Sequence, residues 1–261
     1  MNGLHSYAYF NQWRTIHPRD KLAFALVSMV LCVFSPLIIP PLLALLICTF
    51  IIVAQAKIPA GIYLKFFTVP LGFIIIGALS VALSITSAPS LFLWDISVGP
   101  YTVGMTGPGL HHAMLLTAKS SGAVACLLLL ALTTPIEDLA WQLERCRIPY
   151  LFIELITLVF RFIFVFWEQA LGIHTAQAAR LGHVDVKTGL RSLAFLASSL
   201  FLNVIHRSNA LYNGLVSRNY SDSLRVLKEE PPATPTMTVV GFLAVDALLL
   251  GLIFYRGSGL I

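Results

Sequence analysis

The sequence predicts an all-α, polytopic membrane protein, with about five transmembrane helices and a cytoplasmic domain of three amphipathic helices, two of them long. Three observations support this fold class. The chain of 261 residues is 57% hydrophobic and 11% charged, whereas soluble domains are about 25% charged. It contains five apolar runs near the length of a membrane helix. Its lysines and arginines concentrate in one region, where ten fall between Arg145 and Lys228.

The apolar runs give the membrane helices. A spanning helix needs about 20 predominantly apolar residues, and the runs that approach this length are 22–38, 41–56, 64–86, 113–133 and 236–255. The second run is short, and the prolines before it suit a tight hairpin. The connection 87–109 carries three prolines, four glycines and no basic residue, which predicts a loop outside the cell.

Orientation follows from the positive-inside rule, because loops that stay in the cytoplasm are enriched in lysine and arginine. Arg14, Arg19 and Lys21 place the N-terminus inside, and Lys57 and Lys65 place the second turn inside as well. The last helix then runs outward. We therefore expect a multi-pass protein whose N-terminus and basic region face the cytoplasm.

The chain is expected to have three parts. Residues 1–133 carry the first four membrane helices, residues 134–230 form the cytoplasmic domain, and residues 231–261 carry the C-terminal membrane helix. The middle part differs from the others because its apolar residues recur on one helical face instead of filling whole segments.

Three amphipathic helices are predicted in the middle part. The first is Pro135–Arg147, the second runs as one long helix from about 150 to 180, and the third runs from about 187 to 218. The third has an apolar stripe at helical spacing, which predicts packing on another helix. The stripe includes Leu193, Leu196, Leu200, Phe201 and Val204.

Each long helix ends in an isolated arginine, in the triplets Ala179-Arg180-Leu181 and Ser217-Arg218-Asn219. One arginine in the last turn of a helix has an ordinary explanation, since positive charge is favoured near the negative end of the helix dipole. Two such arginines, each ending an amphipathic helix of the same domain, indicate a repeated device for contacting a partner.

The motifs of catalytic and nucleotide-binding sites are missing from the sequence. The stretch "GHVDVKTG" has Val186 where a phosphate-binding loop needs glycine before its lysine. His111 and His112 point about 100° apart on a helix and do not readily share a metal ion. The basic residues are scattered among apolar ones, which argues against nucleic-acid binding. We therefore expect neither an enzyme nor a resident cofactor or metal.

Apart from Lys65 at a helix end, two charged residues fall within the predicted membrane helices. Asp246 is expected to face the bundle interior and to accept a hydrogen bond there. Lys119 is expected near the outer end of the fourth helix, where its stem can carry the ammonium group to the interface. A buried functional lysine is the alternative. The four cysteines form no C-x-x-C pair and are expected to be buried free thiols.

Several stretches, taken in order, resemble the transmembrane T component of energy-coupling-factor (ECF) transporters, in its cobalt-type CbiQ branch. They are "HPRDKLAFAL", "LLALTTPIEDLAWQLERCRIP", "LVFRFIFVFWEQA", "QAARLG" and "LVSRNY". In that family the two arginine motifs are often Ala-Arg-Gly. Here they are Ala-Arg-Leu and Ser-Arg-Asn, so the flanking residues differ while both arginines remain.

The resemblance implies a non-enzymatic scaffold in the bacterial inner membrane. Such a subunit links two cytoplasmic ATPase subunits (CbiO-like) to a membrane substrate-binding subunit (CbiM-like), and a small CbiN-like subunit is a further candidate partner. Its long coupling helices cross, and Arg180 and Arg218 with their flanking residues each dock on one ATPase. The partners would bind ATP and cobalt, so this chain would carry no cofactor.

Other functions stay open at this point. The same component in a nickel or vitamin (biotin-like) importer would share these motifs. An ordinary ATP-driven importer permease would carry a single coupling loop, which "EQALG" at Glu168 echoes. A membrane-embedded enzyme would have to use Glu154, Arg161 and Asp246, for which ion pairing or hydrogen bonding between helices is the simpler explanation.

Overall fold

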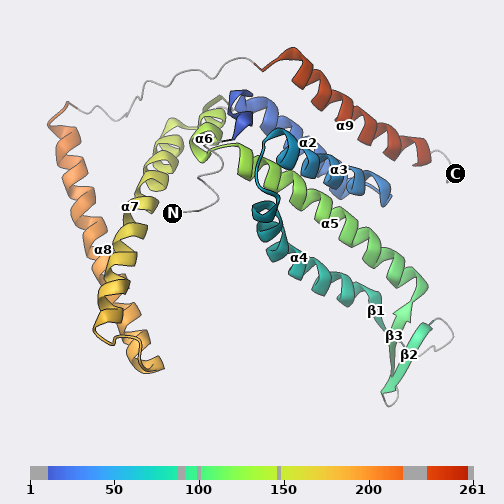
Figure 1. Ribbon diagram of the computed structural model, residues 1–261, viewed down its shortest axis with the longest axis horizontal. Helices are drawn as coiled ribbons and strands as arrows, with labels where there is room; N and C mark the ends of the chain where they lie inside the picture. Colours follow the sequence, from blue (N-terminus) through green and yellow to red (C-terminus); the bar gives the residue numbers. More distant parts are fainter. Residues whose placement is uncertain (1–10, 87–91, 99–100, 146–147, 220–233, 258–261) are drawn as a thin grey trace. The chain divides into compact units, whose positions relative to one another are not determined.

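The computed structural model describes residues 11–86, 92–98, 101–145, 148–219 and 234–257. The predicted fold class is confirmed, because helices account for most of these residues (Figure 1). The chain divides into two compact units. One comprises Met1–Leu139 with Glu230–Ile261, and the other comprises Ala140–Glu229.

Each of the five predicted membrane segments corresponds to a helix of the first unit. A short 3₁₀ turn, η1 (Gln12–Thr15), precedes them, and a π-helical segment, η2 (Ile51–Gln55), extends the second. The five helices are α2 (Pro18–Phe34), α3 (Ile39–Phe50), α4 (Ala60–Ala82), α5 (Gly107–Thr133) and α9 (Thr236–Gly257).

Three of these helices begin four to six residues before the predicted apolar runs, at local start signals. Proline opens α2, where the His17 side chain accepts a hydrogen bond from the Arg19 backbone N–H. The Thr106 hydroxyl oxygen accepts from the Gly109 N–H, 3.1 Å away, at the start of α5. Hydropathy locates the apolar run, whereas proline and capping residues decide where the helix begins.

Among the described residues, four helices are long and apolar enough to cross a membrane, judged by length and composition. They are α4, α5, α9 as far as Tyr255, and α8 (Val186–Val216) of the second unit. The continuous apolar stretch Ile39–Gln55 is shorter, and α2 has 17 residues, at the lower limit for spanning a bilayer. The amphipathic pattern predicted the length of α8, but not that the helix is apolar enough to span a membrane.

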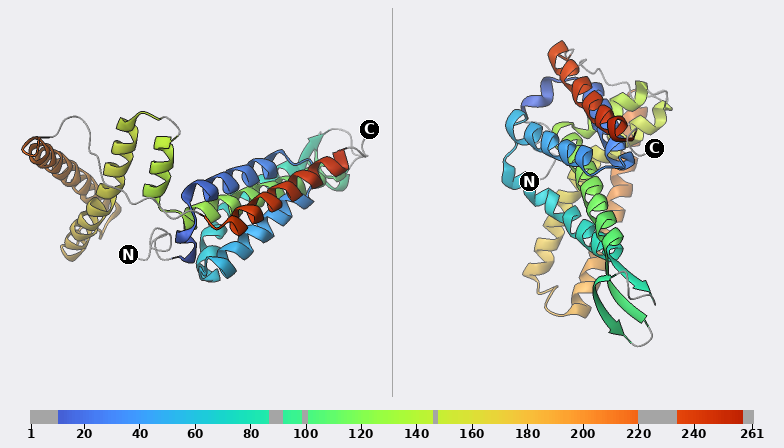
Figure 2. Two further views of the ribbon diagram at one scale, coloured as in Figure 1. Left: turned by 90° about the horizontal axis from the view of Figure 1, so that it is seen from above. Right: turned by 90° about the vertical axis from the view of Figure 1, so that its right-hand side faces the viewer.

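Helix α5 is the centre of the first unit and contacts α2, α3 and α4, while α9 packs on α2 and α3. Figure 2 shows these helices side by side as a bundle. The rings of Phe24 and Phe242 stack at 4.5 Å between α2 and α9. Nearby, the Ser28 hydroxyl donates to the Asp246 carboxylate over 2.7 Å, and both residues are buried. The prediction that Asp246 faces the interior is confirmed.

Two helices of this core approach each other closely at Gly122 of α5. A Cβ atom there would lie 2.7 Å from the Pro41 carbonyl oxygen and 3.3 Å from the Cys32 sulfur. The Cys48 and Cys126 sulfurs are 3.6 Å apart. Cys32, Cys48 and Cys126 are buried free thiols, as predicted, and Cys146 lies outside the described residues.

Side chains from distant segments cap the C-terminal end of α5. The Asn11 amide nitrogen donates to the Leu132 and Thr133 carbonyl oxygens, each 3.3 Å away. The Lys21 ammonium group donates to the Thr133 carbonyl over 3.1 Å, and its charge also interacts with Asp138. These carbonyls have no helical partner beyond the end of α5, so the two side chains satisfy them inside the unit.

The connection between α4 and α5 differs from the predicted loop. It contains three antiparallel strands, β1 (Leu83–Thr86), β2 (Phe92–Val98) and β3 (Tyr101–Thr106), in the order β1-β3-β2. Prolines and glycines suggested irregular structure, but β2 and β3 are rich in the β-branched and aromatic residues that favour strands. Residues 87–91 and 99–100 lie outside the described residues.

Lys119 lies elsewhere than expected. The prediction placed it near the outer end of its helix, but α5 begins at Gly107, so twelve residues precede it and fourteen follow as far as Thr133. It is half-buried near the middle of α5.

In the predicted cytoplasmic region, α6 (Ile136–Arg145) is followed by α7 (Tyr150–Ala179) and α8. Residues 146 and 147, the predicted end of the first of these helices, lie outside the described residues. Helices α7 and α8 contact each other as an antiparallel hairpin and cross at an angle (Figures 1 and 2). The Gln177 amide bonds to Ser192 near the turn, and Arg207 lies 5.9 Å from the Phe162 ring farther along.

Replacing Gly122 with alanine is expected to lower the stability of the membrane unit by about 1–3 kcal/mol, because the added methyl group clashes with Pro41 backbone that cannot easily shift. The measurement is thermal unfolding of the detergent-solubilised protein. The control is Gly72→Ala on α4, where an added Cβ has no neighbour within 4 Å. Equal melting temperatures for the two variants would contradict the close approach.

Candidate functional site: two arginine-ended helix termini

The first arginine triplet forms a hydrogen-bonded cap at the end of α7. Arg180 is the last residue of near-helical geometry, and Leu181 follows with a left-handed backbone, φ 57°. The Leu181 N–H donates to the Ala178 carbonyl over 3.1 Å, and the Gly182 N–H donates to the Gln177 carbonyl over 2.8 Å. These two bonds define a Schellman motif, which satisfies carbonyls that the helix leaves free.

The second triplet shares the left-handed residue and the inner hydrogen bond of this cap at the end of α8. Asn219 has the same left-handed backbone, φ 57°, and its N–H donates to the Val216 carbonyl over 3.1 Å. Arg218 therefore occupies the position in its cap that Arg180 occupies in the first. In the described part of the chain, three non-glycine residues have a positive φ: Leu181, Asn219 and Lys57.

This geometry explains why glycine suits the third position of such a motif. A left-handed backbone costs glycine nothing and asparagine little, but it costs another residue about 1–2 kcal/mol. Asn219 is therefore a good substitute for glycine, whereas Leu181 is strained. The Leu181 side chain is 71% exposed, so burial of its apolar surface does not offset this strain.

The first cap is braced by α8. The Gln177 amide donates to the Ser192 carbonyl over 2.8 Å, and the Ser192 hydroxyl donates to the Gly182 carbonyl over 2.7 Å. The rings of His174 and His183 stack beside the turn at 4.7 Å. Sequence reasoning did not identify Gln177 or Ser192, because their role arises from the helix pairing and leaves no local motif.

Both arginines are exposed, and neither forms an ion pair or a side-chain hydrogen bond with a residue that the structure describes. They lie at opposite ends of α8, whose 31 residues span about 46 Å. A guanidinium group offers five donors in a rigid fork that suits carboxylates and exposed carbonyls. The site is therefore a pair of exposed cations, carried on hydrogen-bonded backbone caps and too far apart to share one pocket.

The predicted packing stripe of α8 divides into two parts in the structure. Leu196 and Leu200 are half-buried, on the line of residues that faces α7. Leu193, Phe201 and Val204 are 51%, 65% and 39% exposed. None of the described residues of α8 is buried, because α7 is the one helix that it contacts extensively. The hairpin therefore carries an apolar surface that this chain leaves uncovered.

Helix α7 shows a similar division. Glu154 is buried, whereas Arg161, seven residues later, is exposed. Near the start of α5 the His111 and His112 rings are 6.1 Å apart and tilted by 60°. Within the described part of the chain there is no group of three or more His, Cys, Asp or Glu residues arranged to hold a metal ion.

Replacing Leu181 with glycine is expected to stabilise the protein by about 0.5–1 kcal/mol, since glycine removes the left-handed strain but adds freedom to the unfolded chain. The change should raise the melting temperature of the solubilised protein by a few degrees at most. Asn219→Gly is the matched control and should change it less. Leu181→Val should lower it, because a β-branched residue fits this backbone worse. If Leu181→Val raised the melting temperature, the assignment of backbone strain to Leu181 would be refuted.

A family model described as cobalt transport protein, CbiQ, matches residues 11–228. The cobalt transport protein CbiQ of Rhodobacter capsulatus is 34% identical over 228 residues, which are 86% of each chain. That of Salmonella typhimurium is 32% identical over 210 residues, 79% of this chain and 92% of the relative. A putative fused cobalt transport protein, CbiMQ, of Methanocorpusculum labreanum is 34% identical over 233 residues, 89% of this chain and 39% of the fused protein.

The relatives match along most of the chain, and the family model includes both arginine-ended helices. Together with the membrane-length helices they make this chain a membrane component of cobalt transport, and it belongs to the CbiQ cobalt transport protein family.

Proposed function

We propose that this chain is the coupling subunit of an ATP-driven cobalt importer of the energy-coupling-factor type. It links two cytoplasmic ATPase subunits to a membrane subunit that binds the substrate. The observation that carries the proposal is the pair of matching helix caps, which present Arg180 and Arg218 at opposite ends of α8. In this proposal the partners bind cobalt and ATP, and this chain binds neither.

The distance between the arginines supports one docking point per ATPase. A globular domain of about 250 residues has a radius of gyration of about 18 Å, so the centres of two such domains in contact lie roughly 45 Å apart. This is close to the length of α8, about 46 Å. Each arginine triplet, Ala179-Arg180-Leu181 and Ser217-Arg218-Asn219, would therefore reach an equivalent groove on a different subunit.

The caps also support docking through their rigidity. The Schellman bonds hold Arg180 at a defined angle to α7, and Ser192 fixes the turn against α8. A preorganised donor loses less conformational entropy on binding than a flexible one. The exposed apolar residues Leu193, Phe201 and Val204 supply adjoining surface for the ATPases or for the membrane subunit.

The membrane partner is suggested by the fused relative. This chain matches 39% of that protein, whose name combines CbiM with CbiQ. We therefore propose a CbiM-like subunit as the membrane partner, in the bacterial inner membrane. Helix α4 offers it a surface, because Tyr63 and Ala82 are the two residues of α4 that are buried within this chain.

An ordinary permease that lines its own pathway is the second candidate, and one observation favours it. Helix α8 is long and apolar enough to span a bilayer. However, it is the least hydrophobic of the four candidate helices in the described residues. It also carries Lys187, Arg191 and Arg207, which are costly in lipid. We therefore assign α8 to the cytoplasmic side.

The docking proposal is tested by copurification of this chain with coexpressed CbiO-like ATPase subunits. Arg180→Glu and Arg218→Glu are each expected to weaken recovery of the ATPase about tenfold, and the double variant to abolish it together with coupled ATP hydrolysis. Arg191→Glu is the control, because Arg191 is exposed on the same hairpin and lies over Phe195 of its own helix. A double variant that assembles and hydrolyses ATP normally would overturn the proposal.

The side of the membrane is tested by cysteine labelling in a background without native cysteines. Val184→Cys and Asn213→Cys place thiols at exposed positions near the two ends of α8, outside the docking triplets. Both are expected to react with a membrane-impermeant maleimide in inside-out vesicles and to be protected in intact cells. If one position were labelled in inside-out vesicles and the other in intact cells, α8 would span the membrane. That result would favour the permease.

A further inference from the structure

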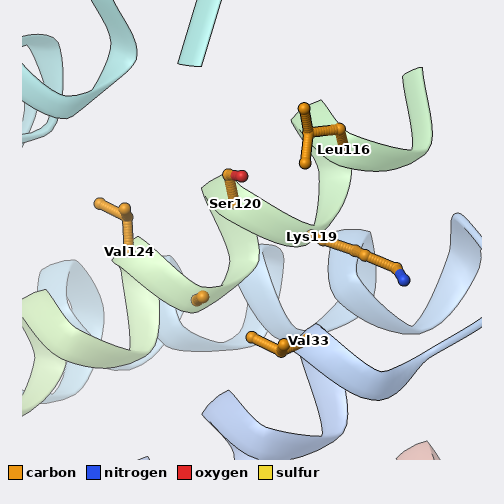
Figure 3. A pocket seen from close by; sticks show the side chains of 6 residues that line it. Val33, Leu116, Lys119, Ser120 and Val124 are labelled. Atoms are coloured by element: carbon orange, nitrogen blue, oxygen red, sulfur yellow. The ribbon is translucent and has the colours of Figure 1, made fainter. Parts of the chain in front are cut away.

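A pocket of about 490 Å³ surrounds a lysine in the middle of the membrane bundle. It is lined by Leu116, Lys119, Ser120, Ala123 and Val124 of α5, which share one helical face, and by Val33 of α2. Figure 3 shows Lys119 extended away from α5, with its ammonium group clear of the other labelled side chains. The pocket therefore has apolar walls and one cation.

The depth of Lys119 limits what can neutralise it. Its Cα lies about 18 Å along the helix from Gly107 and about 21 Å from Thr133. The 27 residues of α5 span about 40 Å, against a hydrocarbon thickness of about 30 Å. The apolar run 113–133 alone spans about 30 Å, so the Lys119 Cα lies about 9 Å inside the boundary at residue 113, beside Val33 near the end of α2. A lysine stem of roughly 6 Å ends short of this boundary.

No described residue of this chain neutralises Lys119. It forms no ion pair or hydrogen bond in the part of the chain that the structure describes. Asp246, the acid in the middle of α9, accepts its hydrogen bond from Ser28 on α2. A charge held in lipid without a partner is costly, and such residues usually mark a functional contact. The counter-charge is therefore to be sought on another chain.

We propose that the Lys119 pocket binds a carboxylate side chain on a transmembrane helix of the CbiM-like subunit. This rests on the proposed function, which supplies the membrane partner, and on the fused relative that joins the two components in one chain. The carboxylate would pair with the ammonium group, and Ser120 offers a hydroxyl beside it. The walls formed by Val33, Leu116 and Val124 suit the apolar flank of a membrane helix.

The test is copurification of the CbiM-like subunit and the ATPase subunits with this chain from cells that express all of them. Lys119→Met keeps the apolar stem and removes the charge, and it is expected to lower recovery of the CbiM-like subunit at least tenfold. Lys119→Arg should retain most of it. Arg19→Met is the control, because Arg19 is an exposed cation at the start of α2, outside the proposed contact surfaces. Recovery of the ATPase should not change, since it depends on Arg180 and Arg218.

A Lys119→Met protein that elutes as a single species and recovers the CbiM-like subunit at wild-type level would overturn the inference. The inference would also be overturned if Lys119→Met lost a bound anionic lipid, detected by mass spectrometry, while the CbiM-like subunit was retained. Loss of ATPase recovery in the arginine variants tests the proposed function separately. The partner acid is identified by combining Lys119→Glu with lysine at each membrane-embedded Asp or Glu of the CbiM-like subunit, and one such pair should restore recovery.

Discussion

The bundle depends on how the C-terminal end of α5 is satisfied. This helix contacts three others, and it ends at Thr133 because Pro135 follows and cannot continue the helical hydrogen bonding. Its last carbonyls would be left without donors in an apolar setting, which costs free energy for each unsatisfied group. The Asn11 amide and the Lys21 ammonium group supply the donors. The positive charge of Lys21 also suits the negative end of the helix dipole.

Polar contacts between other distant segments of the chain lie at the same end of the bundle. The Thr234 hydroxyl, just before α9, donates to the Asp20 carboxylate and accepts from the His17 backbone N–H. The N-terminal segment is thus held between the end of α5 and the start of α9. Both connections to the second unit leave from these segments, near Leu139 and near Glu230. A force applied to the second unit is therefore transmitted along the chain to this end of the bundle. Polar contacts, in addition to apolar packing, hold the helices together there.

Hydropathy and periodicity predicted the helices that fill the membrane unit, since burial in lipid demands uninterrupted apolar residues. They did not predict the strands between α4 and α5, because prolines and glycines masked the β-forming residues between them. They also placed Lys119 too near a helix end, because the apolar run begins after the true start of α5 at Gly107. The arginine triplets could be found from sequence, but Gln177 and Ser192 could not, because their roles need the pairing of α7 with α8.

The two caps have a mechanical consequence if each arginine is held by a different ATPase. The distance between Arg180 and Arg218 is set largely by α8, a helix of 31 residues that cannot shorten without breaking its backbone hydrogen bonds. Two ATPases that approach each other cannot compress it, so their movement must tilt α8 or bend the turn that joins it to α7. The turn is braced by Ser192 and Gln177, and tilting breaks few contacts because none of the described residues of α8 is buried. The softer response is therefore a change in the crossing angle of α7 and α8, and that change is the signal the hairpin can pass to the membrane unit.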